Sequence, residues 1–128
     1  MAATVTGPET ECRPSVNLTQ TPTAKTDDFT VTAASVAKLF SNLGASKTIV
    51  FTLPAVAEWA GHAMRFAVKA AQIIRLLPQT GEKIFLDGDG VATKYVNIAA
   101  VIGNFAEVFN NGTSIEVVAY NGVVTKEA

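Results

Sequence analysis

The segment between Pro54 and Pro78 constrains the fold most, because its apolar residues satisfy two incompatible periodicities. As a helix, the segment repeats apolar side chains at three- and four-residue steps and carries its polar residues on the opposite face. The apolar set is Val56, Trp59, Ala63, Phe66, Ala70, Ile73 and Leu77. Proline in the first turn and again after the last turn is typical of helix boundaries. This interpretation predicts one helix over residues 54–77.

The same segment and its flanks also fit a series of strands. Apolar residues alternate with others at Ile49, Phe51 and Leu53, at Met64, Phe66 and Val68, and at Ile84 and Leu86. In this interpretation Gly61 separates two strands and Ala70-Ala71 forms a tight corner. Ala-rich segments favour helix, whereas β-branched and aromatic flanks favour strand. Periodicity alone leaves both interpretations open.

The composition is that of one compact domain with few charges. The chain has 128 residues, of which 48% are hydrophobic and 16% charged, and its formal net charge is -1. A chain of this length and apolar content can bury a core of its own. Because the charges are balanced, the chain has no broad basic surface, and we predict no nucleic-acid partner. Because so few charges are present to cover an apolar surface, we expect the protein to self-associate.

Cysteine content and hydropathy limit the compartment in which the chain works. Cys12 is the only cysteine, so an intramolecular disulfide and a cysteine-based metal site are both excluded. The first residues, MAATVTGPETECR, have neither the basic start nor the apolar run of a signal peptide, and no apolar run is long enough to span a bilayer. We therefore expect a protein with no membrane partner, made and used on the soluble side.

Residues 1–28 are predicted to form an extended N-terminal arm. They contain seven Thr, three Pro (Pro8, Pro14 and Pro22) and no aromatic residue, so they lack a core of their own. Such a segment is either a simple tail or an arm that becomes ordered against another protein, where an extended chain can add a strand to a sheet edge. We predict that the arm takes part in attachment.

Residues 29–128 are predicted to form one domain of short strands and turns. The segment 29–42 is predicted to begin as a strand, and this strand pattern weakens at Ala33-Ala34. Later strands are expected at Lys47–Leu53, Met64–Lys69, Gln72–Leu77, Lys83–Asp87, Lys94–Ile102, Ala106–Phe109, Ser114–Tyr120 and Val123–Lys126. The tight turns Asn110-Asn111-Gly112 and Asn121-Gly122 join the last three strands, which predicts an antiparallel meander.

Several of these turns and apolar runs occur in an order shared with a known kind of module. The order is TLP at residues 52–54, an Ala-rich turn ending at Gly61, RFAVKAAQIIRLLPQTGEKI at residues 65–84 and FAEVFNNGTSIEVVAYNG at residues 105–122. This order resembles a small all-β module of tailed-bacteriophage virion proteins, over about residues 29–124. The resemblance favours strands over residues 54–77. It implies an all-β fold, an antiparallel β-sandwich or jelly-roll-like domain with an extended N-terminal arm.

The resemblance also implies a function. Within this family, a short chain with no fibrous repeat is similar to a capsid decoration (cement) protein, which binds the outer surface of the major capsid protein shell and stabilises it. These modules usually assemble around threefold axes, so the resemblance implies a homotrimer on the capsid surface of the virion, made in the host cytoplasm. The alternatives are a tail-fibre or tail adaptor, and a host-carbohydrate-binding virion module. The last would need several exposed aromatic residues, and only Trp59, Tyr95 and Tyr120 are candidates.

Few residues are suited to catalysis. His62, the only histidine, could form a Ser-His-acid site with Glu58, and Cys12 lies far away in the predicted arm. Glu107 and Glu116 could be cross-strand neighbours in the last hairpin, but exposed hairpin charges are usually solvated. We therefore predict no catalytic or cofactor-binding residue and no enzymatic activity.

One segment is similar to a metal-binding loop. Asp87-Gly88-Asp89-Gly90 matches the start of a calcium loop, but a third oxygen ligand at alternate spacing and the closing Glu are both missing. A tight turn accounts for the same residues. Trp59, the only tryptophan, is predicted to be a core or interface anchor rather than a ligand platform, because no second aromatic residue follows at a matching spacing.

Overall fold

The structure is a computed structural model that describes residues 23–35, 38–86, 90 and 92–126. Within these ranges the helical elements are two 3₁₀ turns, η2 (Ala33–Ser35) and η3 (Val56–Glu58). The remaining named elements are strands. The fold is therefore mostly β.

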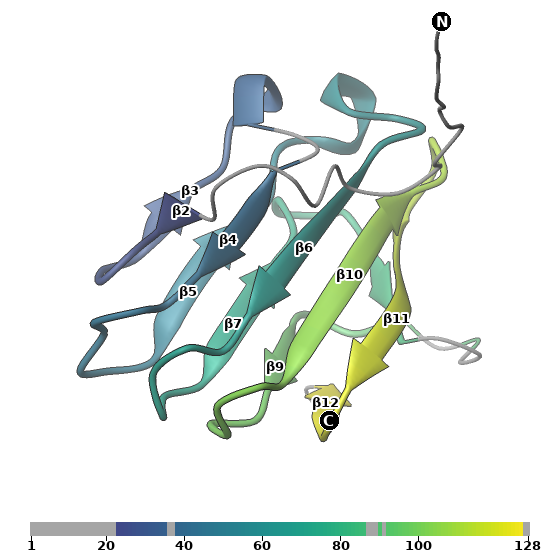
Figure 1. The fold of residues 1–128 in the computed structure, drawn as a ribbon. Coiled ribbons are helices and arrows are strands. Elements are labelled where there is room, and N and C mark those ends of the chain that lie inside the picture. The colour runs from purple at the N-terminus through teal and green to yellow at the C-terminus, as the bar shows by residue number, and fades with distance from the viewer. Residues whose placement is uncertain (1–22, 36–37, 87–89, 91, 127–128) are drawn as a thin grey trace, which may run out of the picture.

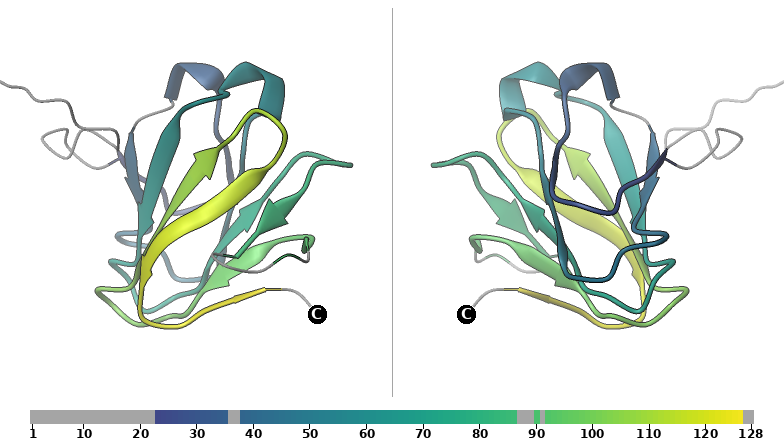
Figure 2. Two further views of the ribbon diagram at one scale, coloured as in Figure 1. Left: turned by 90° about the vertical axis from the view of Figure 1, so that its right-hand side faces the viewer. Right: turned by 90° about the vertical axis from the view of Figure 1, so that its left-hand side faces the viewer.

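The strands form two sheets, and Figure 1 shows one in front of the other. The larger sheet contains, in spatial order, β2 (Thr23–Ala24), β4 (Leu39–Ser41), β6 (Ala63–Ala67), β10 (Phe105–Asn110), β11 (Ile115–Asn121) and β8 (Ile84–Phe85). The smaller sheet contains β12 (Val124–Lys126), β9 (Val96–Ile98), β7 (Ile74–Leu77), β5 (Ile49–Thr52) and β3 (Phe29–Thr30). The side views in Figure 2 show the same two layers from their edges.

The helix considered for residues 54–77 is not formed. The short turn η3 and the strands β6 and β7 take its place. From Met64 to Val68, burial alternates with a period of two, because Met64, Phe66 and Val68 are fully buried and the residues between them are half-buried. Before β6, Gly61 adopts a φ of 83°, a left-handed backbone that suits glycine and stops a helix. The strand interpretation of this segment is confirmed.

Both sheets mix parallel and antiparallel pairs, so the expected antiparallel architecture is wrong. In the larger sheet β4 pairs with β6 in parallel, and in the smaller sheet β5 pairs with β7 in parallel. The connections explain this: the chain crosses to the other sheet after β4, returns for β6 and crosses again for β7. Strands two apart in sequence thus become neighbours with the same direction. Ala70-Ala71, expected to form a tight corner, lies in the β6–β7 loop, which joins the two sheets.

The last three strands do not form the predicted meander. The strands β10 and β11 do pair as an antiparallel hairpin through Asn110-Asn111-Gly112, with a register shift after Glu107. In the next turn Gly122 has a φ of 82°, and the chain then crosses to the smaller sheet, where β12 pairs with β9. The meander prediction failed because a short turn can join strands of different sheets as well as strands that pair.

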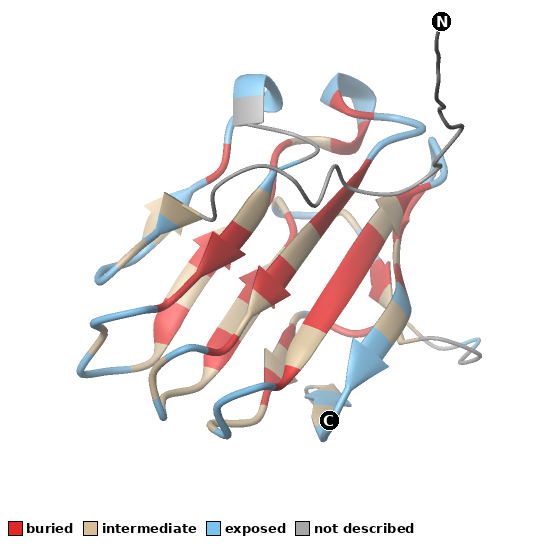
Figure 3. Ribbon diagram, in the orientation of Figure 1, coloured by how far each residue is buried: buried red, intermediate tan, exposed pale blue. Residues whose placement is uncertain are grey.

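Side chains from both sheets form one hydrophobic core. Phe40 and Phe66 of the larger sheet pack on Phe51 of the smaller sheet, with ring centroids 5.5 and 5.0 Å from it. Trp59 is 1% exposed, and its Nε1 donates a hydrogen bond to the carbonyl oxygen of Pro54 at 2.9 Å. Figure 3 shows the buried segments running along the middle of the strands. The prediction that Trp59 is an anchor is confirmed, since it lies in this core.

The residues that precede β3 belong to the edges of the sheets. The strand β2 pairs with β4, and the backbone N–H of Lys25 donates to the carbonyl oxygen of Ser41 at 2.9 Å. Asp28 Oδ1 accepts a hydrogen bond from the backbone N–H of Val50 at 3.0 Å. Residues 23–28, which the sequence assigns to the arm, are therefore bound to the domain. The remainder of the predicted arm, with Cys12, lies outside the described residues, as does the segment 87–89.

Candidate functional site

Four loops that connect the two sheets gather at one end of the molecule, at the bottom of Figure 1. They are the β4–β5, β6–β7, β9–β10 and β11–β12 loops. Three of these loops carry large apolar side chains with high exposed fractions: Leu43 (59%), Val101 (59%), Ile102 (63%) and Val123 (60%). We call these four residues the apolar end. Loops at one end of a molecule that carry several large exposed apolar side chains are a candidate interaction site.

Asn42 fastens the first of these loops to the second. Its side chain is fully buried, and Oδ1 accepts hydrogen bonds from the backbone N–H groups of Lys69 at 2.7 Å and Ala70 at 2.9 Å. Its Nδ2 donates to the carbonyl oxygens of Ala70 at 3.2 Å and Gln72 at 3.1 Å. Asn42 thus uses both acceptor and both donor positions of its amide to bind the β6–β7 loop. Leu43 is the next residue along the chain and is held in place by this attachment.

The third and fourth loops are fastened in a similar way. The backbone N–H of Val68 donates to the carbonyl oxygen of Asn104 at 2.8 Å, and that of Gly103 donates to Val68 at 3.0 Å. Asn121 Nδ2 donates to the carbonyl oxygen of Gly103 at 3.3 Å. A Cβ atom on Gly122 would collide with the Asn104 side chain, so these two residues pack directly. The apolar end is therefore held in place, which lowers the entropy cost of binding a partner.

An ion pair beside the apolar end carries no net charge. Lys47 lies in the β4–β5 loop, and its Nζ is 2.7 Å from Asp27 Oδ1. The hydrogen bond from Lys47 lowers the pKa of Asp27, and the same bond raises the pKa of Lys47. Both side chains are exposed to solvent, so the pair contributes little to stability.

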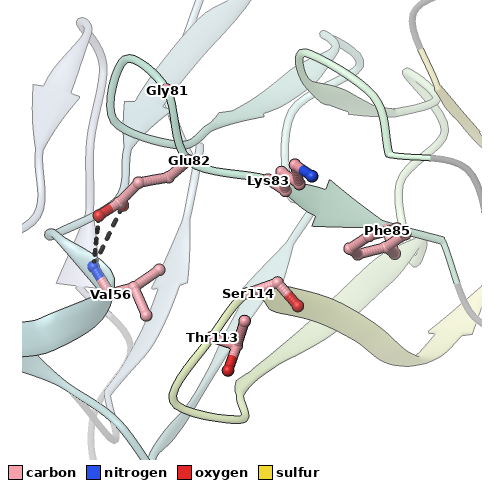
Figure 4. Close-up of a pocket in the computed structure, with 7 residues that line it drawn as sticks. All are labelled: Val56, Gly81, Glu82, Lys83, Phe85, Thr113 and Ser114. Carbon is pink, nitrogen blue, oxygen red and sulfur yellow. Dashed lines mark hydrogen bonds between the residues drawn. The ribbon is translucent and has the colours of Figure 1, made fainter.

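A cavity of about 320 Å³ lies near the other end of the molecule, between η3, the turn before β8 and the β10–β11 hairpin. Its lining consists of Val56, Gly81, Glu82, Lys83, Phe85, Thr113 and Ser114 (Figure 4). Both carboxylate oxygens of Glu82 accept hydrogen bonds from the backbone N–H of Val56, at 3.0 and 3.1 Å. Figure 4 shows Lys83 directed away from that carboxylate. Glu82 therefore caps η3, and this geometry does not leave it free as a general base.

The residues considered for chemistry are not brought together. His62 and Glu58 are both exposed, and no hydrogen bond or ion pair joins their side chains within the described chain. Trp59 is enclosed in the core and cannot offer its face to a sugar. Tyr120 is 47% exposed on β11 of the larger sheet, whereas the half-buried Tyr95 precedes β9 of the smaller sheet. The aromatic residues thus do not share one surface.

Glu107 differs from its prediction. The register of β10 and β11 places Glu107 opposite Ala119 and Glu116 opposite Phe109, so the two carboxylates are not direct neighbours. Only 9% of the Glu107 side chain is exposed, and its Oε1 accepts a hydrogen bond from Arg65 Nη2 at 3.3 Å. The prediction of a solvated charge is wrong for Glu107, because Arg65 on β6 neutralises it. The sequence pattern missed this pair, whose members are 42 residues apart.

Three further findings complete the description of the site. Among the described residues, no three His, Cys, Asp or Glu side chains are grouped so that they could hold a metal ion. The same residues include no helix that is long and apolar enough to cross a membrane. No protein-family model matches the chain, and neither a curated protein nor a solved structure is significantly similar to it.

Proposed function

We propose that this chain is a bacteriophage capsid decoration (cement) protein, which binds the outer surface of the major capsid protein shell and stabilises it. The observation that carries the proposal is the apolar end, since exposed side chains such as Leu43, Ile102 and Val123 are suited to contact with another protein. The kind of partner is taken from the resemblance of the turn pattern to phage virion modules. Such a protein acts by binding and has no catalytic role.

The apolar end can contribute useful binding energy. Complete burial of a Val, Leu or Ile side chain is worth about 1.5–3 kcal/mol. The four side chains are 59–63% exposed, so covering them contributes roughly 4–7 kcal/mol before the costs of association. Those costs are of similar size, so one copy alone binds weakly. A trimer that attaches through three such ends gains avidity of about 10² to 10⁴.

The finer fold class belongs to the same proposal. We assign a β-sandwich, because inward residues of two sheets form one core. The parallel pairs β4–β6 and β5–β7 distinguish it from a purely antiparallel jelly roll. Residues 1–22 are proposed as an extended arm that adds to the attachment, supported by their Thr- and Pro-rich composition.

The test measures binding to shells of the phage that encodes the chain, after the shells have been freed of this protein. Cosedimentation of purified protein with the shells should saturate at a fixed number of copies. Ile102→Asp places a charge in the apolar end and should weaken binding at least tenfold. Ala57→Asp is the matched control, because Ala57 is exposed in η3 at the other end of the molecule. This variant should bind like the natural chain.

Two results would contradict the proposal. If the natural chain does not bind shells, the decoration function is wrong, and binding to tails instead would support the adaptor alternative. If Ile102→Asp and Ala57→Asp bind shells equally well, the apolar end is not the attachment surface. Circular dichroism spectra of both variants establish that the substitutions leave the fold unchanged.

A further inference from the structure

The smaller sheet has an outward side, which faces away from the viewer in Figure 1 because the larger sheet lies in front. Its core side is formed by buried residues such as Ile74 and Ile98. Residues directly opposite each other in neighbouring strands lie on the same side of a sheet. One row across the outward side therefore consists of Thr125, Asn97, Arg75 and Val50. Within the strands β5, β7, β9 and β12, Arg75 is the one charged residue on this side.

Two contacts hold the Arg75 guanidinium in place. Its Nε donates a hydrogen bond to Asn97 Oδ1 at 2.9 Å. The guanidinium also lies over the ring of Tyr95, 4.1 Å from the ring centroid. Both Arg75 and Tyr95 are half-buried. A planar guanidinium that stacks on a ring and donates from Nε has a fixed plane, so the directions of its other N–H groups are fixed as well.

The outer edge of this guanidinium is free. Among the described residues, the N–H groups of its two Nη atoms have no hydrogen-bond or ion-pair partner. Arg65, by contrast, is paired with Glu107. An arginine edge with two parallel N–H groups is the geometry that holds both oxygens of a carboxylate. Arg75 thus presents such an edge in a fixed orientation.

The carboxylates that border the smaller sheet do not neutralise Arg75. Asp28 precedes β3, and its Oδ1 accepts a hydrogen bond from the backbone N–H of Val50 at 3.0 Å. Glu82 follows β7, and both its oxygens are bonded to the backbone N–H of Val56. No ion pair joins either carboxylate to Arg75 within the described chain. The charge of Arg75 is therefore open to an acceptor from another molecule.

A cavity of about 230 Å³ begins on the same side of β7. Leu77, which contributes to its lining, lies two residues after Arg75 and roughly 7 Å further along the strand. Lys94 also lines this cavity and is exposed, whereas the carboxylate of Glu82 in the same lining is occupied as described above. The surroundings of Arg75 thus offer space for a bound segment and a second positive charge.

We propose that Arg75, positioned by Tyr95 and Asn97, binds a carboxylate side chain in an acidic segment of a partner protein. One free edge with two donors matches the two oxygens and the single charge of a carboxylate. A phosphate group has nearly two charges and three acceptor oxygens, more than this edge can pair. A free small acid would gain only the bonds to this edge, whereas a protein segment also fills the adjacent cavity. This inference is independent of the capsid function, because it states only the chemistry of the contact.

NMR titration of the full chain with an acetylated hexaglutamate peptide at low salt tests the proposal. The Arg75 Nε–H signal should shift and saturate. Arg75→Gln should raise the dissociation constant at least fivefold. Arg75→Lys keeps the charge but lacks the planar edge, so it should also weaken binding at least threefold. Lys38→Gln is the matched control: it removes one exposed positive charge before β4 of the larger sheet and should change the constant less than twofold.

Four results would overturn the proposal. Equal binding by Arg75→Gln and Lys38→Gln would show that Arg75 is not the site, and natural affinity in Arg75→Lys would show attraction to charge alone. Tighter binding of inorganic phosphate than of acetate at the Arg75 signal would exclude the carboxylate assignment. A chain with Asp87→Asn and Asp89→Asn that binds the peptide more than fivefold tighter would show that its own carboxylates compete for Arg75.

The failure of this proposal is distinguishable from the failure of the capsid function. A natural chain that binds the peptide through Arg75 but does not bind shells would overturn the capsid function and support the carboxylate site. A chain that binds shells but shows no Arg75-dependent peptide binding would overturn the carboxylate site alone.

Discussion

Replacing Asn42 by alanine should strongly destabilise the protein, because one buried amide makes four hydrogen bonds to the β6–β7 loop. The net contribution of one such bond is about 0.5–1.5 kcal/mol, so four contribute roughly 2–6 kcal/mol. Lys69, one of the partners, is exposed, so water can replace part of what is lost. We therefore expect Asn42→Ala to lower the free energy of unfolding by about 2–4 kcal/mol. This is a large part of the roughly 5–15 kcal/mol that stabilises a typical domain.

Urea unfolding followed by tryptophan fluorescence measures this loss directly, since Trp59 is the only tryptophan and is buried. Asn42→Asp separates the two halves of the amide. It keeps an acceptor for two backbone N–H groups but turns an oxygen toward the carbonyl oxygens of Ala70 and Gln72. At neutral pH this variant should therefore be destabilised despite its nearly unchanged shape. Asn121→Ala removes one exposed bond of 3.3 Å and should cost less than about 1 kcal/mol.

The reasoning would be refuted by an Asn42→Ala variant whose free energy of unfolding falls by less than about 1 kcal/mol, the contribution of a single bond. An Asn42→Asp variant as stable as the natural chain would also refute it, because the donor half of the amide would then be irrelevant.

Two further predictions concern the same end of the molecule. Gly122→Ala should destabilise by about 1–3 kcal/mol in thermal unfolding, more than Gly81→Ala, because both glycines have positive φ but only the first meets Asn104. Equal losses would show that the packing on Asn104 is unimportant. Lys47→Met should raise the pKa of Asp27 toward its ordinary value in an NMR titration. Because Lys47 lowers this pKa, the small contribution of the ion pair to stability is fully present above the ordinary carboxyl pKa and is lost as pH falls through the lowered pKa. An unchanged Asp27 titration in the Lys47→Met variant would contradict this prediction.

The strands could be predicted from sequence because inward and outward residues alternate. Ile49 and Phe51 on β5, and Met64 and Phe66 on β6, are buried at every second position. The turn Asn110-Asn111-Gly112 was also predictable, since Gly112 has a φ of 93° in the hairpin. Local periodicity and turn chemistry thus indicate where strands begin and end.

The assignment of strands to sheets could not be predicted in this way. Ile74 of the smaller sheet and Phe66 of the larger sheet contribute to one core, so each is buried whichever sheet its strand joins. The loop at Ala70-Ala71 is equally compatible with a hairpin and with a crossing between layers. The buried side chain of Asn42 stabilises the path in which this loop crosses between the sheets, because it bonds to the loop backbone. Its partners lie 27 to 30 residues away in the sequence. No local pattern encodes those contacts.

The apolar end was missed for a related reason. Val101 and Ile102 looked like the end of a strand over Lys94–Ile102, but β9 ends at Ile98. Asn104 Nδ2 donates to the carbonyl oxygen of Ala99 at 3.3 Å, which bends the chain into a loop and exposes both side chains. The sequence carried no signal for this loop, because adjacent β-branched residues also occur inside strands, as Ile49 and Val50 do in β5.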